Sequence, residues 1–490
     1  MTDEQPVAWR PIAAMSLAYA ALLIVFSGRY GYHRDELYFI AIGGHPAFGY
    51  ADQPPLIPLL AHAMDALSGG SLVWLRVPSA LAGGLAILVT ALITREFGGG
   101  RGAQLLAAGS MALSSVLMAS SHLASTTVFD VLGWTLCTWL VVRALRDGGR
   151  AWLWVGLVAG IDLEVKTLIA FLLFGLLVGV LALGPREVLR ERWLWLAGLL
   201  TVLLWLPNLW WQATHGWPQL ELSKAIAAGD SGTSQPRWVF LPFQLLLVSP
   251  LLFPIWVAGL VRLARDPALR SWRSIAAAYV LLVVLFIATG GKPYYLAGMF
   301  PVLLAAGSAP TLAWARKKRS RRIALGTALA LSLVVPLVAF LPLVPARDLK
   351  NTPILAINYD AGETVGWPAF TAQVTHAYDA LPADQRAHAV VLAINYGEAG
   401  AVLHQPGAPP TYSGHNSLWT LGPPPSDTAT VVAVGFDGSE LRRWFTGVRE
   451  VATIDNGVGL DNDEQGTEVW TGTGPRKSWV QLWPEMRTLG

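Results

Sequence analysis

The residues best suited to chemistry follow the first apolar run of membrane length. Asp35 and Glu36 come directly after His33 and Arg34, and a further acid, Asp52, lies in the same connection. Carboxylates are costly near a membrane and commonly mark functional sites there. An adjacent pair can act as a general base, can hold a divalent metal ion, or can be a solvated loop end without a chemical role. Because a histidine, an arginine and a third acid lie near the pair in the sequence, we interpret this connection as a reaction site.

Other charged residues lie where further apolar runs begin or end. Asp130 opens one run, where it can bind a substrate or simply favour the positive end of a helix dipole. Lys166 and Lys292 lie at the membrane boundary, where a lysine can reach toward the headgroups or bind a phosphate. Lys292 stands between a glycine pair and a proline, with Tyr294 and Tyr295 following. We expect both lysines to bind phosphate.

Tryptophans are concentrated in residues 205–217, a segment that also holds Asn208 and His215. Tryptophans gather at membrane interfaces as anchors whatever the function of the protein. Their faces also stack on sugar rings, and Asn208 and His215 would then contact a donor or an acceptor. The sequence leaves both interpretations open.

The composition is that of an integral membrane protein. Of its 490 residues, 53% are hydrophobic and only 14% are charged, and the mean hydropathy is +0.46. The first apolar run lacks a small-residue cleavage site, so we expect an uncleaved first span. Cys137 is the single cysteine, so it has no intramolecular disulfide partner and gives no information on the compartment.

The apolar runs predict a polytopic α-helical protein with about eleven membrane helices of about 20 residues each. The predicted helices lie near residues 10–28, 71–94, 103–122, 127–146, 152–166, 167–184, 193–212, 239–261, 274–290, 295–314 and 323–343. The fifth and sixth adjoin at Lys166 with hardly any loop between them, so their division is the weakest part of this prediction.

Basic residues are clustered in every second connection, which is the pattern of cytoplasmic loops. The opposite connections hold Asp35, Glu36, Asp52, Asp65, Asp162, Glu221, Asp230 and Lys292. An odd number of spans with a cytoplasmic amino terminus places the tail on the outer side of the membrane.

The tail, residues 344–490, differs in charge and pattern from residues 1–343. It carries 16 acidic and 9 basic residues, a net charge of −7, which leaves +10 for the remainder of the chain. Strand-like runs at 389–395, 430–435, 448–454 and 467–470 alternate with helix-like runs at 369–381 and 438–445. We therefore predict two domains, a membrane domain over 1–343 and a soluble, extracytoplasmic α/β domain over 344–490.

Two polar motifs of the tail fall where predicted strands end, the usual location of ligand contacts in α/β sheets. They are Asn395-Tyr-Gly-Glu398-Ala-Gly and Thr411-Tyr-Ser-Gly-His415-Asn-Ser-Leu-Trp419. No nucleophilic or metal-binding constellation can be assembled from them. The tail is either a binding or positioning module or a purely structural one.

The chain resembles the GT-C membrane glycosyltransferases of family 39, which include protein O-mannosyltransferases and bacterial aminoarabinose transferases acting on lipid A. Five motifs carry the resemblance and together span most of residues 10–343. They are Asp35-Glu36-Leu-Tyr with Gly49-Tyr-Ala-Asp52-Gln-Pro-Pro-Leu56, Thr127-Val-Phe-Asp130, Gly160 to Lys166, Leu206-Pro-Asn208-Leu-Trp-Trp-Gln212-Ala-Thr-His215-Gly-Trp-Pro218, and Lys292-Pro-Tyr-Tyr295-Leu.

The resemblance implies a GT-C fold and the transfer of a sugar from a polyprenyl-phosphate donor to an acceptor hydroxyl, with inversion. The reaction would take place at the outer face of the bacterial cytoplasmic membrane, on a cell-envelope lipid, glycan or protein. No nucleic acid partner is expected. Asp35, with Glu36 beside it, would be catalytic, and Asp35 would be the base that deprotonates the acceptor.

The resemblance also implies which other residues bind substrate. They would be Arg34, Asp52, Asp130, Lys166, Asn208, His215, Lys292, Tyr294 and Tyr295. The resemblance does not fix a cofactor, and metal dependence stays open; a divalent cation, if one binds, would be held by Asp35 and Asp130.

The chain departs from the family pattern at two places. Gln53 stands where relatives often have a lysine or a histidine, which puts a charge role of that position in doubt. Asp162 and Glu164 precede Lys166 where apolar residues are expected. These two acids can pair with the lysine or line the cavity.

Two other function classes stay open. A transporter or flippase of lipid-linked or small polar substrates would also be polytopic, although no paired repeats with broken spans are seen in the two halves. A receptor that binds cell-wall polymers through its tail would keep its function when Asp35 is changed to asparagine. The sequence does not identify the sugar, the acceptor or the oligomeric state.

Overall fold

The computed structural model describes residues 5–229 and 235–490, so Asp230 lies outside the described residues. Contacts divide the chain into two compact units. The first unit comprises Met1–Ser27, Arg76–Gly216 and Ile226–Leu341, and the second comprises Gly28–Leu75, Trp217–Ala225 and Pro342–Gly490. Residues 28–75 contain the connection that is predicted to lie on the outer side of the membrane, named the first outer connection, and they fold with the tail. The predicted domains, residues 1–343 and 344–490, have other boundaries than these units, and that division stays a prediction.

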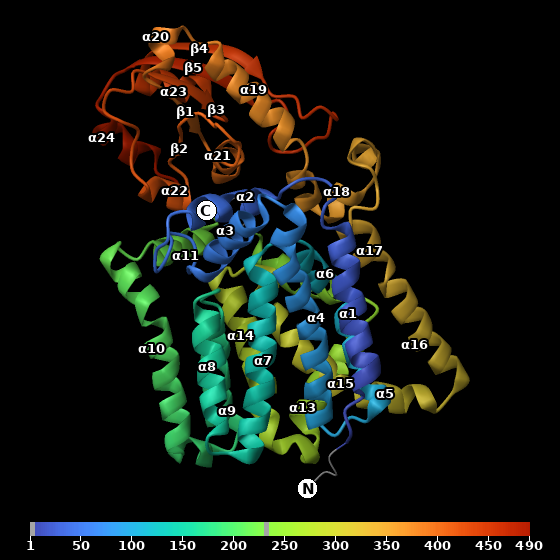
Figure 1. The fold of residues 1–490 in the computed structure, drawn as a ribbon. Coiled ribbons are helices and arrows are strands. Elements are labelled where there is room, and N and C mark those ends of the chain that lie inside the picture. The colour runs from blue at the N-terminus through green and yellow to red at the C-terminus, as the bar shows by residue number, and fades with distance from the viewer. Residues whose placement is uncertain (1–4, 230–234) are drawn as a thin grey trace. The chain divides into compact units, whose positions relative to one another are not determined.

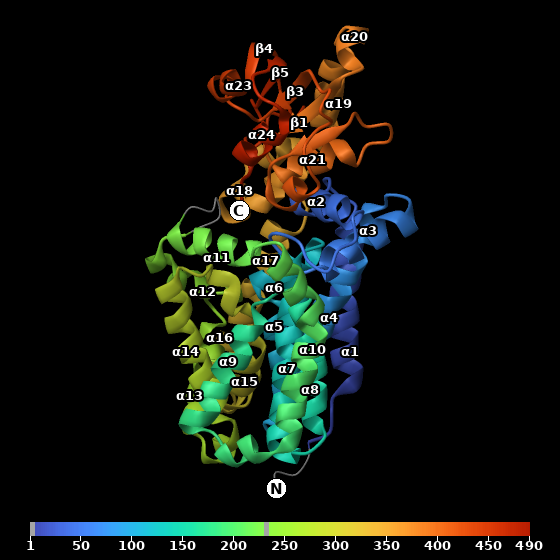
Figure 2. The same cartoon turned by 90° about the vertical axis from the view of Figure 1, so that its left-hand side faces the viewer.

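Seven helical segments among the described residues are long and apolar enough to cross a membrane. They are α1 (Trp9–Phe26), α4 (Leu72–Glu96), α7 (Thr126–Asp147), α10 (Arg192–Thr214), η3 with α14 (Pro267–Thr289), η4 with α15 (Pro293–Arg316), and α16 with α17 (Arg319–Phe340). Most of these helices lie roughly parallel in a bundle (Figures 1 and 2).

Two further pairs of helices pass the same test together but are bent. The pair α5 (Arg101–Ala112) and α6 (Ser115–His122) is bent by 58°. The segment Arg237–Val248, which contains η2 (Arg237–Val239) and α12 (Phe240–Val248), is bent by 107° against α13 (Phe253–Arg265). Counting each pair as one span gives up to nine spans in the described part of the chain.

The polytopic helical architecture is confirmed, but the number of eleven spans is not. The predicted spans 152–166 and 167–184 coincide with α8 (Ala151–Leu163) and α9 (Ile169–Leu183), which have 13 and 15 residues. At about 1.5 Å of rise per residue such helices are shorter than the roughly 30 Å of a bilayer core. The predicted number of full spans therefore stays a prediction.

Small residues let the membrane helices approach closely. A Cβ on Gly259 of α13 would lie 1.9 Å from the carbonyl oxygen of Leu303 in α15, and a Cβ on Gly307 would lie 1.8 Å from that of Ile255. Neither distance is sterically possible, so both positions require glycine. Close backbone contact of this kind is a main source of helix association in membranes.

The second unit contains a five-stranded mixed sheet in the order β2-β1-β3-β5-β4. Its strands are β1 (Ala389–Ala393), β2 (Thr411–Ser413), β3 (Thr430–Val434), β4 (Phe445–Thr453) and β5 (Glu468–Pro475). Strand β1 pairs in parallel with β2 and β3, with Leu392 opposite Tyr412 and Ala433. Strand β5 is antiparallel to β3 and β4. The predicted α/β character of the tail is confirmed, although the three-residue strand β2 was not predicted.

Strands β1 and β3 could be predicted from the sequence because they are buried. Every residue of β1 and β3 is buried, so both strands are continuous apolar runs, as expected for strands covered on both faces. The sheet is accompanied by short helices and by two helices from the first outer connection (Figure 1). These are α2 (Arg34–Gly43), α3 (Leu56–Ser68), α18 (Ile354–Ile357), α19 (Trp367–Asp379), α20 (Ala383–Arg386), α21 (Tyr396–Leu403), α22 (Asn416–Thr420), α23 (Gly438–Trp444) and α24 (Trp479–Leu482).

Five further segments complete the described chain. Helix α11 spans Pro218–Ala228, and the 3-10 helices are η1 (Arg186–Arg190), η5 (Ala346–Asn351), η6 (Tyr359–Thr364) and η7 (Trp483–Met486).

Candidate active site

Helix α2 carries the predicted catalytic residues and is capped by its own first turn. The backbone N–H of Asp35 donates to Nδ1 of His33 at 3.2 Å, and the backbone N–H of His33 donates to Oε2 of Glu36 at 2.8 Å. This reciprocal pair is a capping box. Asp35 thus lies in the first turn, where the positive end of the helix dipole stabilises a carboxylate. Glu36 is fully buried.

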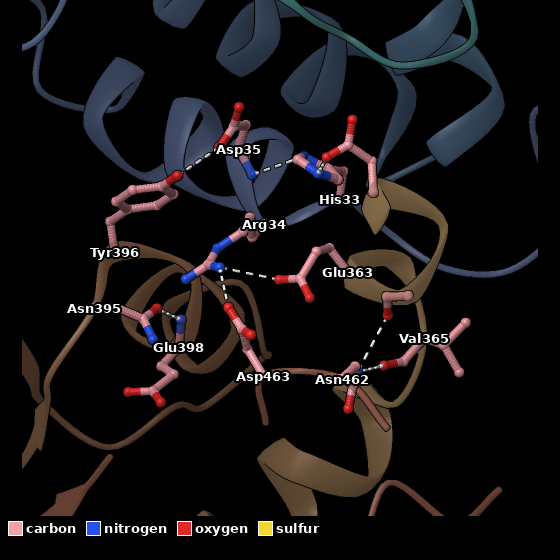
Figure 3. A network of polar contacts seen from close by, with 12 residues as sticks. His33, Arg34, Asp35, Glu363, Val365, Asn395, Tyr396, Glu398, Asn462 and Asp463 are labelled. Carbon is pink, nitrogen blue, oxygen red and sulfur yellow. Dashed lines mark hydrogen bonds and ion pairs between the residues drawn. The ribbon is translucent and has the colours of Figure 1, made fainter. Parts of the chain in front are cut away.

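Asp35 is held by a residue 361 positions further along the chain. The hydroxyl of Tyr396 donates to Oδ1 of Asp35 at 2.8 Å (Figure 3). Tyr396 is the first residue of α21, which begins directly after β1 and is capped by Asn395, whose Oδ1 accepts the backbone N–H of Glu398 at 2.9 Å. The carboxyl end of a buried strand therefore presents a phenol to the carboxylate of Asp35, which is partly exposed.

Two glycines bring α21 and α2 into direct contact. A Cβ on Gly397 would lie 2.7 Å from Cβ of Arg34, and a Cβ on Gly400 would lie 2.8 Å from the carbonyl carbon of Leu37. Both glycines are three residues apart and so share one face of α21. Their small size allows Tyr396 to reach Asp35.

Asp52 is held in the same way by neighbouring hydroxyls. Tyr38 donates to Oδ1 of Asp52 at 2.5 Å, and Ser417 donates to the same oxygen at 2.9 Å. The backbone N–H of Ala51 donates to Oγ of Ser417 at 2.8 Å, which ties the connection to the tail again. Burial raises the pKa of Asp52 to about 6, against the two hydroxyl bonds, which lower it.

Arg34 points into a group of tail carboxylates (Figure 3). Its Nη1 lies 3.0 Å from Oε2 of Glu363 and 2.9 Å from Oδ2 of Asp463. The guanidinium also lies over the ring of Tyr396, with Cζ 5.3 Å from the ring centroid. Its charge is therefore balanced within the second unit.

Two further acids near Arg34 are buried and favour their protonated forms. Burial, and then the charge of Glu464, raises the pKa of Glu398 to about 8. Burial and the charge of Glu363 likewise raise the pKa of Glu464. Glu398 accepts the backbone N–H of Ile394 at 3.2 Å. Gly435, with φ of +82°, gives it room, because a Cβ there would lie 2.8 Å from Oε1 of Glu398.

Two histidines complete this surrounding shell. Because Nδ1 of His33 accepts the capping bond, its proton lies on Nε2, which faces Oδ1 of Asp360 at 3.8 Å. The ring of His415 lies 4.9 Å from the ring of Tyr396. Burial and the nearby charge of Arg34 lower the pKa of His415 to about 4, so its imidazole is neutral at working pH.

The first unit brings together a second set of predicted residues. Asp130 lies in α7 and Asp162 lies near the end of α8, and both are buried. A Cβ on Gly133, on the same face of α7 as Asp130, would lie 2.2 Å from the carboxyl of Asp162. Both acids interact electrostatically with Lys166. Asp162, which departs from the family pattern, is thus a neighbour of the lysine.

Lys166 lies against a hydroxyl and two aromatic rings. Its Nζ donates to Oγ1 of Thr127 at 3.3 Å and lies 5.1 Å and 6.0 Å from the ring centroids of Tyr294 and Tyr295. The two tyrosines belong to η4 (Pro293–Met299), for which Lys292 is the residue before the first turn. The structure therefore brings Lys166, Tyr294 and Tyr295 together, and phosphate binding by Lys166 stays a prediction.

Asn208 and His215 belong to α10 and its carboxyl end. Asn208 is fully buried in the helix. His215 follows the last residue of the helix, stacks on the ring of Trp211 at 4.1 Å, and its Nδ1 lies 2.8 Å from the carbonyl oxygen of Trp211. These contacts with Trp211 place His215 at the end of the helix. Its role in substrate binding stays a prediction.

The predicted metal role of Asp35 and Asp130 can be compared with the positions of the donor groups. Within residues 5–229 and 235–490, no three or more histidine, cysteine, aspartate or glutamate side chains gather where they could hold a metal ion. Asp35 and Asp130 belong to different compact units. A metal role for these two acids therefore finds no supporting cluster in either unit.

The sequence analysis missed several residues that hold Arg34, Asp35 or Asp52. They are Tyr38, Glu363, Tyr396, Ser417 and Asp463. Tyr396 and Ser417 do fall in the two tail motifs placed at strand ends, which was a usable signal. Glu363 and Asp463 had none, since isolated acids in a loop-rich acidic tail look like solvated surface residues.

Parts of this chain resemble known proteins in sequence. The family model for dolichyl-phosphate-mannose-protein mannosyltransferase matches residues 52–211, less than half of the chain. The lipid A galacturonosyltransferase RgtD of Rhizobium johnstonii is 26% identical over 259 residues, which are 50% of this chain and 53% of RgtD. The chain thus spans about half the length of this curated relative.

Solved structures resemble the whole chain at low sequence identity. The crystal structure of ArnT from Cupriavidus metallidurans in the apo state has a TM-score of 0.62 at 14% identity, covering 94% of this chain and 97% of ArnT. The same protein bound to undecaprenyl phosphate has a TM-score of 0.59 at 14% identity, covering 95% and 98%. These likenesses establish the fold.

Proposed function

The chain has the GT-C glycosyltransferase fold, and we propose that it moves a sugar from a polyprenyl-phosphate donor to an acceptor hydroxyl. The observation that carries the proposal is the carboxylate of Asp35, which is partly exposed at the start of a helix and oriented by a neutral hydroxyl. The relatives support it: RgtD is a lipid A galacturonosyltransferase, and ArnT binds undecaprenyl phosphate.

Asp35 acts as the general base. It takes the proton of the acceptor hydroxyl while the acceptor oxygen forms a bond to the anomeric carbon of the sugar. The bond from that carbon to the phosphate oxygen breaks, and its electron pair leaves with the polyprenyl phosphate. Attack opposite the leaving phosphate inverts the configuration. Phosphate is a tolerable leaving group, so a base, positioning and charge neutralisation suffice.

Lys166 and Lys292 neutralise the donor phosphate, with Tyr294 and Tyr295 beside Lys166. A fixed ammonium is a good partner for a phosphate, and two aromatic rings against it restrict its motion. Asp130, next to Lys166, binds the acceptor or the donor sugar.

Arg34 and Glu36 are left out of substrate binding and catalysis in this proposal. The charge of Arg34 is balanced by Glu363 and Asp463, and Glu36 is fully buried in the cap of α2. Asp52 is kept as a residue that shapes the connection through Tyr38 and Ser417.

The protein is a multi-span membrane protein, and the proposed location is the bacterial cytoplasmic membrane with residues 344–490 outside. The alternation of basic and acidic connections supports this orientation. The acceptor is then a lipid, glycan or protein of the cell envelope.

The test is transfer by purified protein in detergent with several radiolabelled polyprenyl-phosphate sugars and envelope acceptors. We expect transfer from at least one donor, and Asp35→Asn should lower kcat by about 10²–10⁴-fold while donor binding stays measurable. Asp379→Asn, at an exposed acid of α19, is the matched control and should leave kcat unchanged. Movement of a lipid-linked sugar across proteoliposomes without transfer would instead support a transporter or flippase.

A further inference from the structure

Tyr396 is immobilised by packing on several sides. Its ring lies 4.7 Å from that of Tyr38 and 4.9 Å from that of His415, and the guanidinium of Arg34 covers it at 5.3 Å. Its backbone is fixed at the first turn of α21 by the cap at Asn395. Because the ring is held in this way, its hydroxyl points toward Asp35.

The hydroxyl of Tyr396 is a permanent hydrogen-bond donor. Burial, and then the negative charge of Asp35, raises the pKa of the phenol well above its usual value, while Arg34 opposes this shift. The phenol therefore stays protonated over the whole range in which an enzyme would work. A neutral donor of this kind orients a carboxylate without neutralising it as a base.

The geometry leaves one oxygen of Asp35 for the reaction. Tyr396 binds Oδ1, and within residues 5–229 and 235–490 no hydrogen bond to Oδ2 is found. The dipole of α2 and the hydroxyl of Tyr396 together fix the carboxylate, since both act on it from defined directions. Oδ2 is the oxygen that can receive a proton.

We propose that Tyr396 is a positioning residue that orients Asp35 for proton abstraction. Tyr396 belongs to the tail, residues 344–490, which is called the C-terminal module here. The inference rests on the proposed function and extends it: residues 344–490 complete the active site and are more than an acceptor-binding attachment. Tyr396 touches neither the donor nor the acceptor in this scheme and acts only through Asp35.

The experiment compares Tyr396→Phe with the wild type in the transfer assay. The variant keeps the ring contacts and loses only the hydroxyl. A hydrogen bond to a charged group contributes enough to predict a drop in kcat of about 10- to 100-fold, with KM for the lipid donor changed less than about 2-fold. The acidic limb of the pH-rate profile should move to higher pH, because a carboxylate that loses a donor holds its proton more tightly.

Tyr378→Phe is the matched control. The hydroxyl of Tyr378 donates to the backbone carbonyl oxygens of Arg386 and Ala389 in the same module, away from Asp35. Its loss removes a comparable hydrogen bond, so a purely structural effect would appear in both variants. We expect kcat and the pH-rate profile of Tyr378→Phe to match the wild type.

A second substitution keeps the hydroxyl. Incorporation of 3,5-difluorotyrosine at position 396 makes the phenol a stronger donor and should move the acidic limb to lower pH. This measurement decides the question if Tyr396→Phe does not fold. An unchanged acidic limb in the folded variants, with an active wild type, would overturn the positioning role alone. A wild type that is inactive with every donor would overturn the proposed function and this inference with it.

Discussion

Two pairs of acids, one pair in each compact unit, have different surroundings. In the second unit the carboxylates of Asp35 and Asp52 accept hydrogen bonds from neutral hydroxyls and are partly exposed. In the first unit Asp130 and Asp162 are buried beside the ammonium of Lys166. A partly exposed carboxylate with neutral partners can exchange a proton with a substrate. A buried acid beside a lysine is suited to electrostatics and binding.

Arg34 and Lys166 each lie beside two acids, but their other neighbours differ. Arg34 is balanced inside the second unit by Glu363 and Asp463, so its role is to hold segments together. Lys166 has a hydroxyl and two aromatic rings around its ammonium group and also interacts with Asp130 and Asp162.

The largest expected change in stability comes from breaking the network of Arg34. Arg34→Met would leave Glu363, which is almost fully buried, without its cation, and removing one partner of a buried pair costs about 3–5 kcal/mol. Thermal unfolding in detergent would measure the loss. Adding Glu363→Gln to Arg34→Met should restore part of it.

Arg442→Met is the control for the Arg34 variant. Arg442 is exposed in α23 and lies over the ring of Trp470 at 5.6 Å, so its loss should change the free energy of unfolding by less than about 1 kcal/mol. Equal effects of the two substitutions would show that Arg34 is an ordinary surface arginine.

A smaller effect, on binding, is expected from Lys166. Lys166→Met should weaken the binding of undecaprenyl phosphate about 10-fold or more, because the ammonium contributes a charge-assisted contact of about 1.5–3 kcal/mol. Titration of the lipid into the purified protein would measure the change. Lys317→Met, at an exposed lysine beyond α15, should bind the lipid like the wild type. Unchanged affinity in the Lys166 variant would place the phosphate elsewhere.

The smallest effect concerns the pH dependence of stability. A buried carboxyl with a raised pKa binds its proton more tightly in the folded chain than in the unfolded chain, so the free energy of unfolding falls as pH rises. Glu398 and Glu464, whose pKa values are raised from 4.5 to about 8, should therefore lower stability as the pH rises from about 4.5 to about 8. Each proton difference contributes at most about 1.4 kcal/mol per pH unit.

The measurement is the melting temperature of the wild type and of Glu398→Gln at several pH values. His415 acts in the opposite direction below about pH 6.5, because its imidazole, with a pKa of about 4 in the folded chain, is protonated there only in the unfolded chain. The variant should show a flatter dependence. A slope identical to that of the wild type would mean that Glu398 is ionised in the folded protein.

Part of the candidate site could be predicted from the sequence. Asp35, Asp52, Asp130 and Lys166 stood out because charges are rare beside apolar runs. The contacts of Glu36 and Arg34 could not be predicted from the sequence. A residue that caps a helix or forms an ion pair has the same side chain as a catalytic residue, and only its partners distinguish the two. Tyr396 could be located at a strand end but not paired with Asp35.

The sequence by itself determined the elements. Apolar length specified helices such as α1, α7 and α14 within a few residues, and fully apolar runs specified β1 and β3, because burial acts on each segment locally. The tertiary structure decided the partners. The bond between Tyr396 and Asp35 joins residues 361 positions apart, and only the packing of α21 on α2 through its glycines brings them together.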